Sequence, residues 1–165
     1  APDRRRLAFL TLAAALLAAP LAAQDVASPS ELRAGQDLLY RGRFGAAQLY
    51  FSQISAERPS DPSGPALEAS TLIWWAEARG DETGDAERID SLLSIAIARS
   101  RTADSLALDS TRVHTLFWLG TAYGYRARQA ELRGSLWRAA RDAKAMQGFL
   151  SRAIAADSTC VDCLL

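Results

Sequence analysis

The stretch that decides the fold is GQDLLYRGRFGAAQLYFSQISAERPSD, residues 35–61. Small residues stand in it at fixed intervals among large apolar ones, most clearly Gly35, Gly42 and Ala47. Glycine inside a helix costs about 1 kcal/mol relative to alanine, so an ordinary amphipathic helix gains nothing from Gly35. We therefore expect a neighbouring helix to pack closely against Gly35 and Ala47.

Helix signals surround this stretch. Ser28-Pro29-Ser30-Glu31 is a capping box with proline at the first helical position, and Gly42 suits the end of the helix that it opens. A second helix is expected over about 44–57, where Pro59 ends it. The two helices predict a hairpin over residues 28–58.

The rest of the chain continues as apolar helical stripes separated by breakers, and no segment alternates with the period of a strand. We expect an irregular connector at 102–110, a helix end at Gly134 and an N-cap at Ser135. The sequence thus predicts an all-α chain with two further hairpins. The expected ranges are 65–79 and 86–101 for the helices of hairpin 65–101, and 111–133 and 136–156 for those of hairpin 111–156.

The spacing of small and large residues resembles the tetratricopeptide repeat. In the first hairpin the resemblance rests on Gly35 with Leu38, Ala47 with Phe51, and Pro59; in the third it rests on Leu116, Leu119, Gly120 and Tyr123. It is weaker in the middle hairpin, where Ala69 or Ser70 takes the close-contact place. The resemblance implies a right-handed stack of antiparallel helical hairpins, an α-solenoid of six main helices.

The same resemblance implies that the first helix of each hairpin lines a concave groove. The candidate groove residues are Gln36, Tyr40, Trp75, Phe117, Thr121 and Tyr125. The lysine and asparagine clamp with which this family holds peptide carboxylates is absent, because Leu32, Gln36 and Phe117 stand at such places. We expect most of the other aromatic residues, Trp137 included, to lie in the core.

Spacing in the third hairpin indicates that both of its helices are about seven residues longer than those of the first, or roughly 10 Å. This hairpin should project beyond its neighbours and carry mostly basic residues, including Arg126, Arg128, Arg133, Arg138, Arg141 and Lys144. The projection could attract an anionic partner. Alternatively, the arginines only solvate long helices and pair with the acidic turn of the middle hairpin.

The N-terminus has the layout of a secretory signal peptide: three arginines, an apolar run and a small-residue cleavage site. We expect cleavage before Gln24, which divides the chain into a signal peptide, 1–23, and a helical repeat domain, 24–165. The apolar run is shorter than a bilayer span. The expected location is therefore the periplasm or the medium of a bacterium, with no membrane span after cleavage.

Cys160-Val161-Asp162-Cys163 is a CxxC at the start of an expected helix. A disulfide, a redox centre and two incidental small residues packing on the sixth helix all remain open. The segment after residue 158 begins what looks like another helix, so we expect the natural chain to continue and the last helix to leave an apolar side uncovered. Self-association through that side is the consequence.

No phosphate loop, catalytic triad, paired-carboxylate site or metal-ligand pattern is present, and the formal charge of zero does not favour nucleic acid. His114 is the only histidine and has no nucleophile partner in the sequence. We expect a non-enzymatic scaffold of the cell envelope, without cofactor, that binds a protein or peptide. The alternatives are an exported thiol-disulfide redox protein using Cys160 and Cys163, and a binder of an anionic envelope polymer.

Overall fold

The computed structural model describes residues 26–81, 83–106 and 109–164, and within these ranges the chain is helical and contains no strand. The all-α expectation is confirmed. The expected signal peptide and its cleavage site lie outside the described residues.

The first hairpin consists of α2 (Pro29–Tyr40) and α3 (Phe44–Glu57), close to the expected ranges. The capping box is present: the Glu31 backbone N–H donates to Ser28 Oγ at 3.3 Å, and the Ser28 N–H donates to Glu31 Oε2 at 2.8 Å. Gly42 has a φ of 70°, which favours glycine. The expected start and end of α2 are therefore both confirmed.

The second hairpin consists of α4 (Ser63–Arg79) and α5 (Ala86–Leu106). The expected irregular connector is wrong for residues 102–106, which continue α5, and for residues 109–110, which begin the next helix. Thr102 Oγ1 donates to the Ala98 carbonyl at 3.1 Å and Ser105 Oγ to the Thr102 carbonyl at 2.7 Å. Because these hydroxyls bond back to the helix and the segment has neither glycine nor proline, nothing ends α5 at residue 101.

The third hairpin consists of α6 (Asp109–Leu132) and α7 (Leu136–Ala156), followed by the short 3₁₀ helix η2 (Val161–Leu164). Gly134 has a φ of 71° and turns the chain as expected. Ser135 stands at the N-cap position, but its side chain makes no capping hydrogen bond to the described residues. With 21 residues α7 exceeds the 14 of α3 by the expected seven, but α6 with 24 exceeds the 12 of α2 by twelve, so the expected equal lengthening is wrong for α6. Because α5 also has 21 residues, the lengthening includes the middle hairpin.

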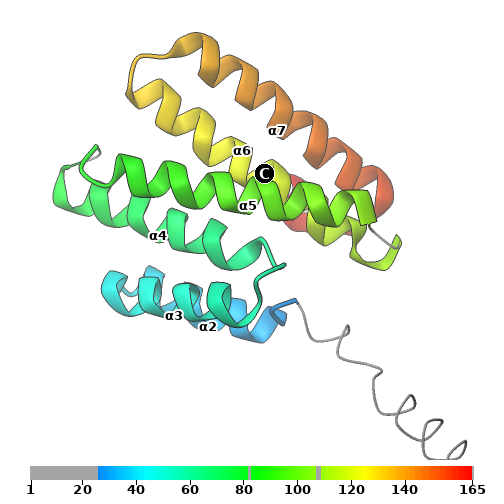
Figure 1. The fold of residues 1–165 in the computed structure, drawn as a ribbon, viewed down its shortest axis with the longest axis horizontal. Helices are drawn as coiled ribbons and strands as arrows, with labels where there is room; N and C mark the ends of the chain where they lie inside the picture. Colours follow the sequence, from blue (N-terminus) through cyan, green and yellow to red (C-terminus); the bar gives the residue numbers. More distant parts are fainter. Residues whose placement is uncertain (1–25, 82, 107–108, 165) are drawn as a thin grey trace, which may run out of the picture.

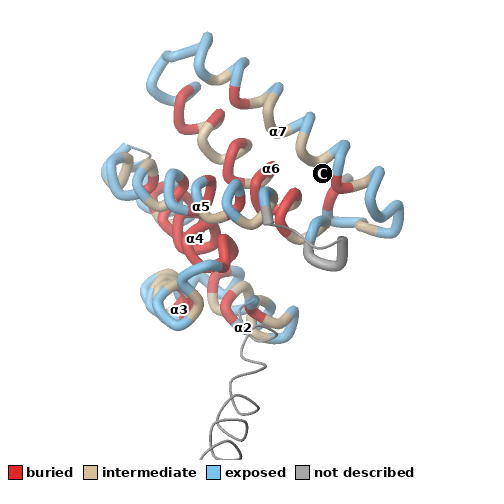
Figure 2. The backbone as a smooth tube through the Cα atoms, turned by 45° about the vertical axis from the view of Figure 1, so that its right-hand side comes forward, coloured by how far each residue is buried: buried red, intermediate tan, exposed pale blue. Residues whose placement is uncertain are grey.

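The hairpins stack in chain order, with α2 and α3 at one end, α4 and α5 in the middle, and α6 and α7 at the other end (Figure 1). Each helix packs against the next one along the chain, and α4 also contacts α6. Burial follows from this order: α4 is buried along most of its length, whereas α7 is largely exposed or half-buried (Figure 2). The middle hairpin is thus the core of the molecule.

Close helix contacts occur where the small residues predicted them. A Cβ on Gly35 would overlap the Phe51 ring and lie 2.8 Å from Tyr50 Cδ1, and Ala47 is fully buried. In the third hairpin a Cβ on Gly120 would lie 2.7 Å from Leu150 Cδ2. The small residues let α2 meet α3, and α6 meet α7, at distances that a larger side chain would prevent.

A buried carboxylate ties three distant segments together. Asp61, between α3 and α4, is 1% exposed; its Oδ2 accepts from the Ala27 N–H at 2.6 Å and its Oδ1 from the Ser63 N–H at 2.9 Å. His114 Nε2 of α6 lies 3.5 Å from Oδ1, and Arg99 of α5 donates to the Asp61 carbonyl at 3.0 Å. His114 therefore acts here as a structural partner.

The tryptophans divide between core and surface. Trp118 is 5% exposed, but Trp74 is 50% and Trp137 is 82% exposed, so the expectation of a buried Trp137 is wrong. Trp137 comes just before the α7 residues that face α6. Successive residues on a helix point about 100° apart, so the Trp137 side chain does not share their direction. Large exposed apolar side chains on the described part of α7 are Leu136 and Trp137, in its first turn, rather than a continuous side along the helix.

Candidate functional site

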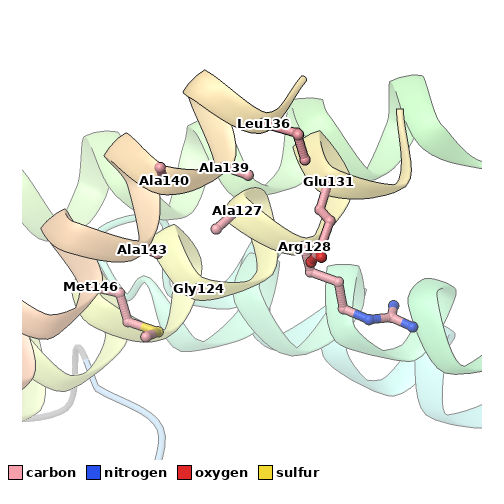
Figure 3. A pocket seen from close by; sticks show the side chains of 9 residues that line it. All are labelled: Gly124, Ala127, Arg128, Glu131, Leu136, Ala139, Ala140, Ala143 and Met146. Atoms are coloured by element: carbon pink, nitrogen blue, oxygen red, sulfur yellow. The ribbon is translucent and has the colours of Figure 1, made fainter. Parts of the chain in front are cut away.

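An open cleft of about 500 Å³ lies between α6 and α7, near the turn that joins them. Its walls are mostly small residues, and Leu136 and Met146 lie at either end of its α7 wall (Figure 3). The small residues are Gly124 and Ala127 of α6 and Ala139, Ala140 and Ala143 of α7. Because these side chains are short, the helices leave space between them instead of filling it.

The rim of this apolar cleft is charged. Arg128 and Glu131 of α6 line it, and the Arg128 guanidinium points away from the cleft (Figure 3). Arg128 forms an ion pair with Glu77 of α4, and both side chains are 35% exposed. The edge of the cleft therefore carries a cation and a carboxylate.

Large exposed apolar side chains lie at the turn between α6 and α7. Leu136 is 69% exposed and lines it, while Trp137 and Leu132 flank the turn at 82% and 38% exposure. Several large exposed apolar side chains gathered at one turn are typical of a surface that meets another molecule.

The candidate groove residues on the first two hairpins do not line this cleft. Tyr40 is 79% exposed and Gln36 is half-buried. Trp75 is half-buried; its ring stacks on Phe44 with centroids 6.2 Å apart, and the Arg79 guanidinium lies 4.8 Å from its centroid. Trp75 thus has partners within its own chain.

The candidate groove residues on α6 lie nearer the core. Phe117 is half-buried with its ring 5.0 Å from that of Trp118, and Thr121 is also half-buried. Ser70 Oγ of α4 donates to the Tyr125 hydroxyl at 3.0 Å. Tyr125 and Phe117 therefore contribute to packing between the middle and third hairpins.

The candidate arginines have partners inside the chain, with one exception. Arg128 pairs with Glu77, Arg133 forms two hydrogen bonds to Asp90, and Arg141 Nε lies 3.4 Å from Asp142 Oδ1. Arg138 has no ion pair with any described residue. The third hairpin does pair with acidic residues of the middle one, namely Glu77, Asp90 and, through Arg152, Asp104. None of the candidate arginines forms an ion pair with a described residue of the acidic turn.

Asp142 is a functional candidate that the sequence interpretation missed. It is 1% exposed, and Arg126 donates to both of its oxygens at 2.7 and 3.0 Å. Burial raises the pKa of Asp142, but the bonds from Arg126 and the charge of Arg141 outweigh this and hold it below its ordinary value. Arg126 also lies 4.6 Å from the Tyr123 ring centroid. The sequence feature that could have indicated Asp142 is its position as the single acidic residue in the basic run 138–144.

The cleft itself was also missed, although its signal is in the sequence. Ala139, Ala140 and Ala143 recur at intervals of one and three residues, which places them on one side of α7, and Gly124 and Ala127 do the same on α6. Two facing rows of small residues predict either a very close helix contact or a cleft. The structure has a close contact at Gly120 and the cleft beyond it.

Cys160 and Cys163 form a disulfide. Cys163 is 2% exposed and packs with Leu116 and Ala153, so the segment also packs on the last hairpin as expected. Cys160 is half-buried. The described residues contain no cluster of histidine, cysteine, aspartate or glutamate that could hold a metal ion, and no described helix is long and apolar enough to cross a membrane.

Comparison with known proteins gives no relative: no family model, curated protein or solved structure matches this chain.

Proposed function

We propose that this chain is a non-enzymatic scaffold that binds a protein or peptide, with the apolar cleft between α6 and α7 as the place where an apolar side chain of the partner inserts. The observation that carries the proposal is the cleft of about 500 Å³, which lies within the range of 300–1,000 Å³ typical of ligand pockets. The exposed Leu136 and Trp137 beside it supply further apolar contact area.

We also propose that the helical hairpins form a tetratricopeptide-type solenoid. The paired helices, the close contacts at Gly35 and Gly120, and the contact of α4 with α6 support it. In that arrangement α2, α4 and α6 line one surface. We infer that the cleft opens on this surface, because Arg128 at its rim forms an ion pair with Glu77 of α4.

The proposed location is the bacterial envelope or the medium outside it, because the first 23 residues have the layout of a signal peptide. The disulfide Cys160–Cys163 supports an oxidising compartment. Mass spectrometry of the exported protein should find a chain that begins at Gln24. An exported, folded chain that retains residues 1–23 would contradict this location signal.

The experiment that tests the binding function fills the cleft. Ala140→Phe places a ring in the cleft, whereas Ala155→Phe adds the same ring to an exposed α7 position away from it. Mature protein immobilised from both variants and from the wild type is incubated with envelope extract, and captured proteins are quantified by mass spectrometry. We expect a partner held by wild type and Ala155→Phe that Ala140→Phe loses by about tenfold or more, as hot-spot changes do. Equal capture by both variants would contradict the proposal.

The disulfide supports a second candidate function, exchange with a protein dithiol. A thiolate of the substrate would attack Cys160 Sγ, displace the Cys163 thiolate and form a mixed disulfide, which the second substrate thiol would resolve to leave two reduced cysteines and an oxidised substrate. Incubation of the oxidised chain with a reduced dithiol peptide should then release two thiols on Cys160 and Cys163 for each peptide oxidised. A disulfide that stays intact would exclude this function without affecting the scaffold.

A further inference from the structure

A second cleft, of about 270 Å³, lies where α5, α6 and α7 meet, and we call it the basic cleft. Four arginines, one aspartate and one serine line it: Arg126, Arg133, Arg138, Arg141, Asp90 and Ser94. The α6 residues that line the apolar cleft, such as Gly124 and Arg128, each lie two positions from Arg126, about 200° around the helix. The two clefts therefore open on opposite sides of the third hairpin.

Positive charge exceeds negative charge in the basic cleft. The two oxygens of Asp142 are taken by Arg126, and Arg141 reaches one of them only at 3.4 Å. The carboxylate of Asp90 is taken by Arg133, with Nη2 to Oδ1 at 3.0 Å. Arg138 forms no ion pair with a described residue. Four guanidinium groups thus share two carboxylates, which leaves an excess of about two charges.

The position of Arg138 adds to this excess. It lies in the first turn of α7, which contains no acidic residue, and Arg141 follows one turn later. A cation at a helix N-terminus opposes the helix dipole, and like charges three residues apart repel each other. Ser135 at the N-cap gives the first N–H groups of α7 no side-chain acceptor among the described residues. A bound anion would offset the repulsion between Arg138 and Arg141.

We propose that the basic cleft binds a phosphate dianion, either free phosphate or the phosphate monoester of a small molecule, with Arg138 and Arg141 as its principal ligands. Guanidinium groups match phosphate oxygens in pairs of parallel hydrogen bonds, and two of them neutralise a dianion. Arg126 and Arg133, at the wall of the cleft, are each paired with a carboxylate. They therefore add positive electrostatic potential to the cleft rather than free hydrogen-bond donors. This site is separate from the apolar cleft, so it does not depend on the proposed peptide-binding function.

The test is the thermal unfolding of the full chain with inorganic phosphate or glycerol phosphate, each against sodium chloride at the same ionic strength. At about pH 8 both probes are dianions, because the second pKa of a phosphate monoester is about 6. A ligand that binds the native state raises the unfolding midpoint saturably. A rise with both probes identifies a monoester site and a rise with phosphate alone identifies a site for the free ion; either result supports the proposal.

The controls locate the effect. Arg138→Gln should weaken phosphate binding by about tenfold, the usual effect of losing a charged hydrogen bond, and the double change Arg138→Gln with Arg141→Gln should abolish the rise. In chloride Arg138→Gln alone should melt at or above the wild-type temperature, because it removes charge repulsion without breaking an ion pair to a described residue. Arg33→Gln, on the exposed side of α2, should keep the full rise. Equal wild-type midpoints in phosphate and chloride, or a rise that persists in the double variant, would overturn the proposal.

Discussion

At the residue scale, a glycine in a helix has opposite effects in two different surroundings. Gly35 faces the Phe51 ring, whereas Gly148 of α7 has no described atom within 4 Å of the place a Cβ would take. Helix propensity alone favours alanine over glycine at both positions by about 1 kcal/mol. Packing reverses that preference at Gly35, because the added methyl group displaces an aromatic ring in the core.

We therefore expect Gly35→Ala to lower the free energy of unfolding by about 1–3 kcal/mol, as overpacking does, and Gly148→Ala to raise it by about 0.5–1 kcal/mol. Chemical denaturation of the two variants measures both effects. A gain in stability from Gly35→Ala would show that α2 does not meet α3 as closely as described.

Asp61 predicts how the stability of the fold depends on pH. Burial raises the pKa of Asp61, but the bonds from His114, Ala27 and Ser63 outweigh burial and hold it below its ordinary value. A lowered pKa in the folded state means that the ionised carboxylate stabilises the fold fully above its unfolded-state pKa, about 3.9. That stability is lost as pH falls through the folded-state pKa.

Asp61→Asn should accordingly destabilise the chain at neutral pH by about 1–3 kcal/mol, the cost of leaving buried donors without their acceptor. The difference from wild type should shrink between about pH 4 and pH 2 as Asp61 itself becomes protonated. Urea midpoints measured across that range give the comparison. A difference that stays constant down to the lowest pH would show that the ionised form of Asp61 has no structural role.

At the scale of the element, the third hairpin is held by ion pairs of very different burial. Asp142 is 1% exposed and Arg126 is 25% exposed, whereas both members of the Arg133–Asp90 pair are about one third exposed. Loss of one partner of a buried pair leaves an uncompensated charge, while exposed pairs contribute little. The first pair fixes α6 to α7 and the second fixes the hairpin to α5.

Arg126→Gln should therefore destabilise the chain by about 3 kcal/mol, and Arg133→Gln by less than about 1 kcal/mol. Thermal or denaturant unfolding distinguishes the two variants, and circular dichroism of each checks that the helices remain. Equal losses would mean that the burial of Asp142 adds nothing to its pair with Arg126.

Local sequence signals predicted most of the helices. They succeeded where a single residue determines the end of a helix or a turn. Ser28, Gly42 and Gly134 fix an end or a turn by their own conformational preferences, so their positions could be predicted. The end of α5 could not, because Thr102 and Ser105 are turn formers whose hydroxyls here bond back to the helix. Facing small residues give a close contact at Gly120 and a cleft at Ala140. Which of the two forms depends on the angle between the two helices, and a local sequence pattern does not determine that angle.

At the scale of the whole molecule, the two clefts that we propose as binding sites lie at one end of the stack. The middle hairpin lies between its neighbours (Figures 1 and 2). The third hairpin carries the apolar cleft between α6 and α7, and it shares the basic cleft with α5. Leu136 and Trp137 at its turn are the large exposed apolar side chains of α7.

The most direct test of the binding cleft is site-specific photo-cross-linking in cells that make the exported chain. A benzophenone amino acid replaces Ala140 at the cleft in one variant and Ala155, away from it, in the other. The account predicts that position 140 forms a covalent adduct with one protein partner and that position 155 does not. Adducts of equal yield and composition from both positions, or from position 155 alone, would contradict the assignment of the cleft as the binding site.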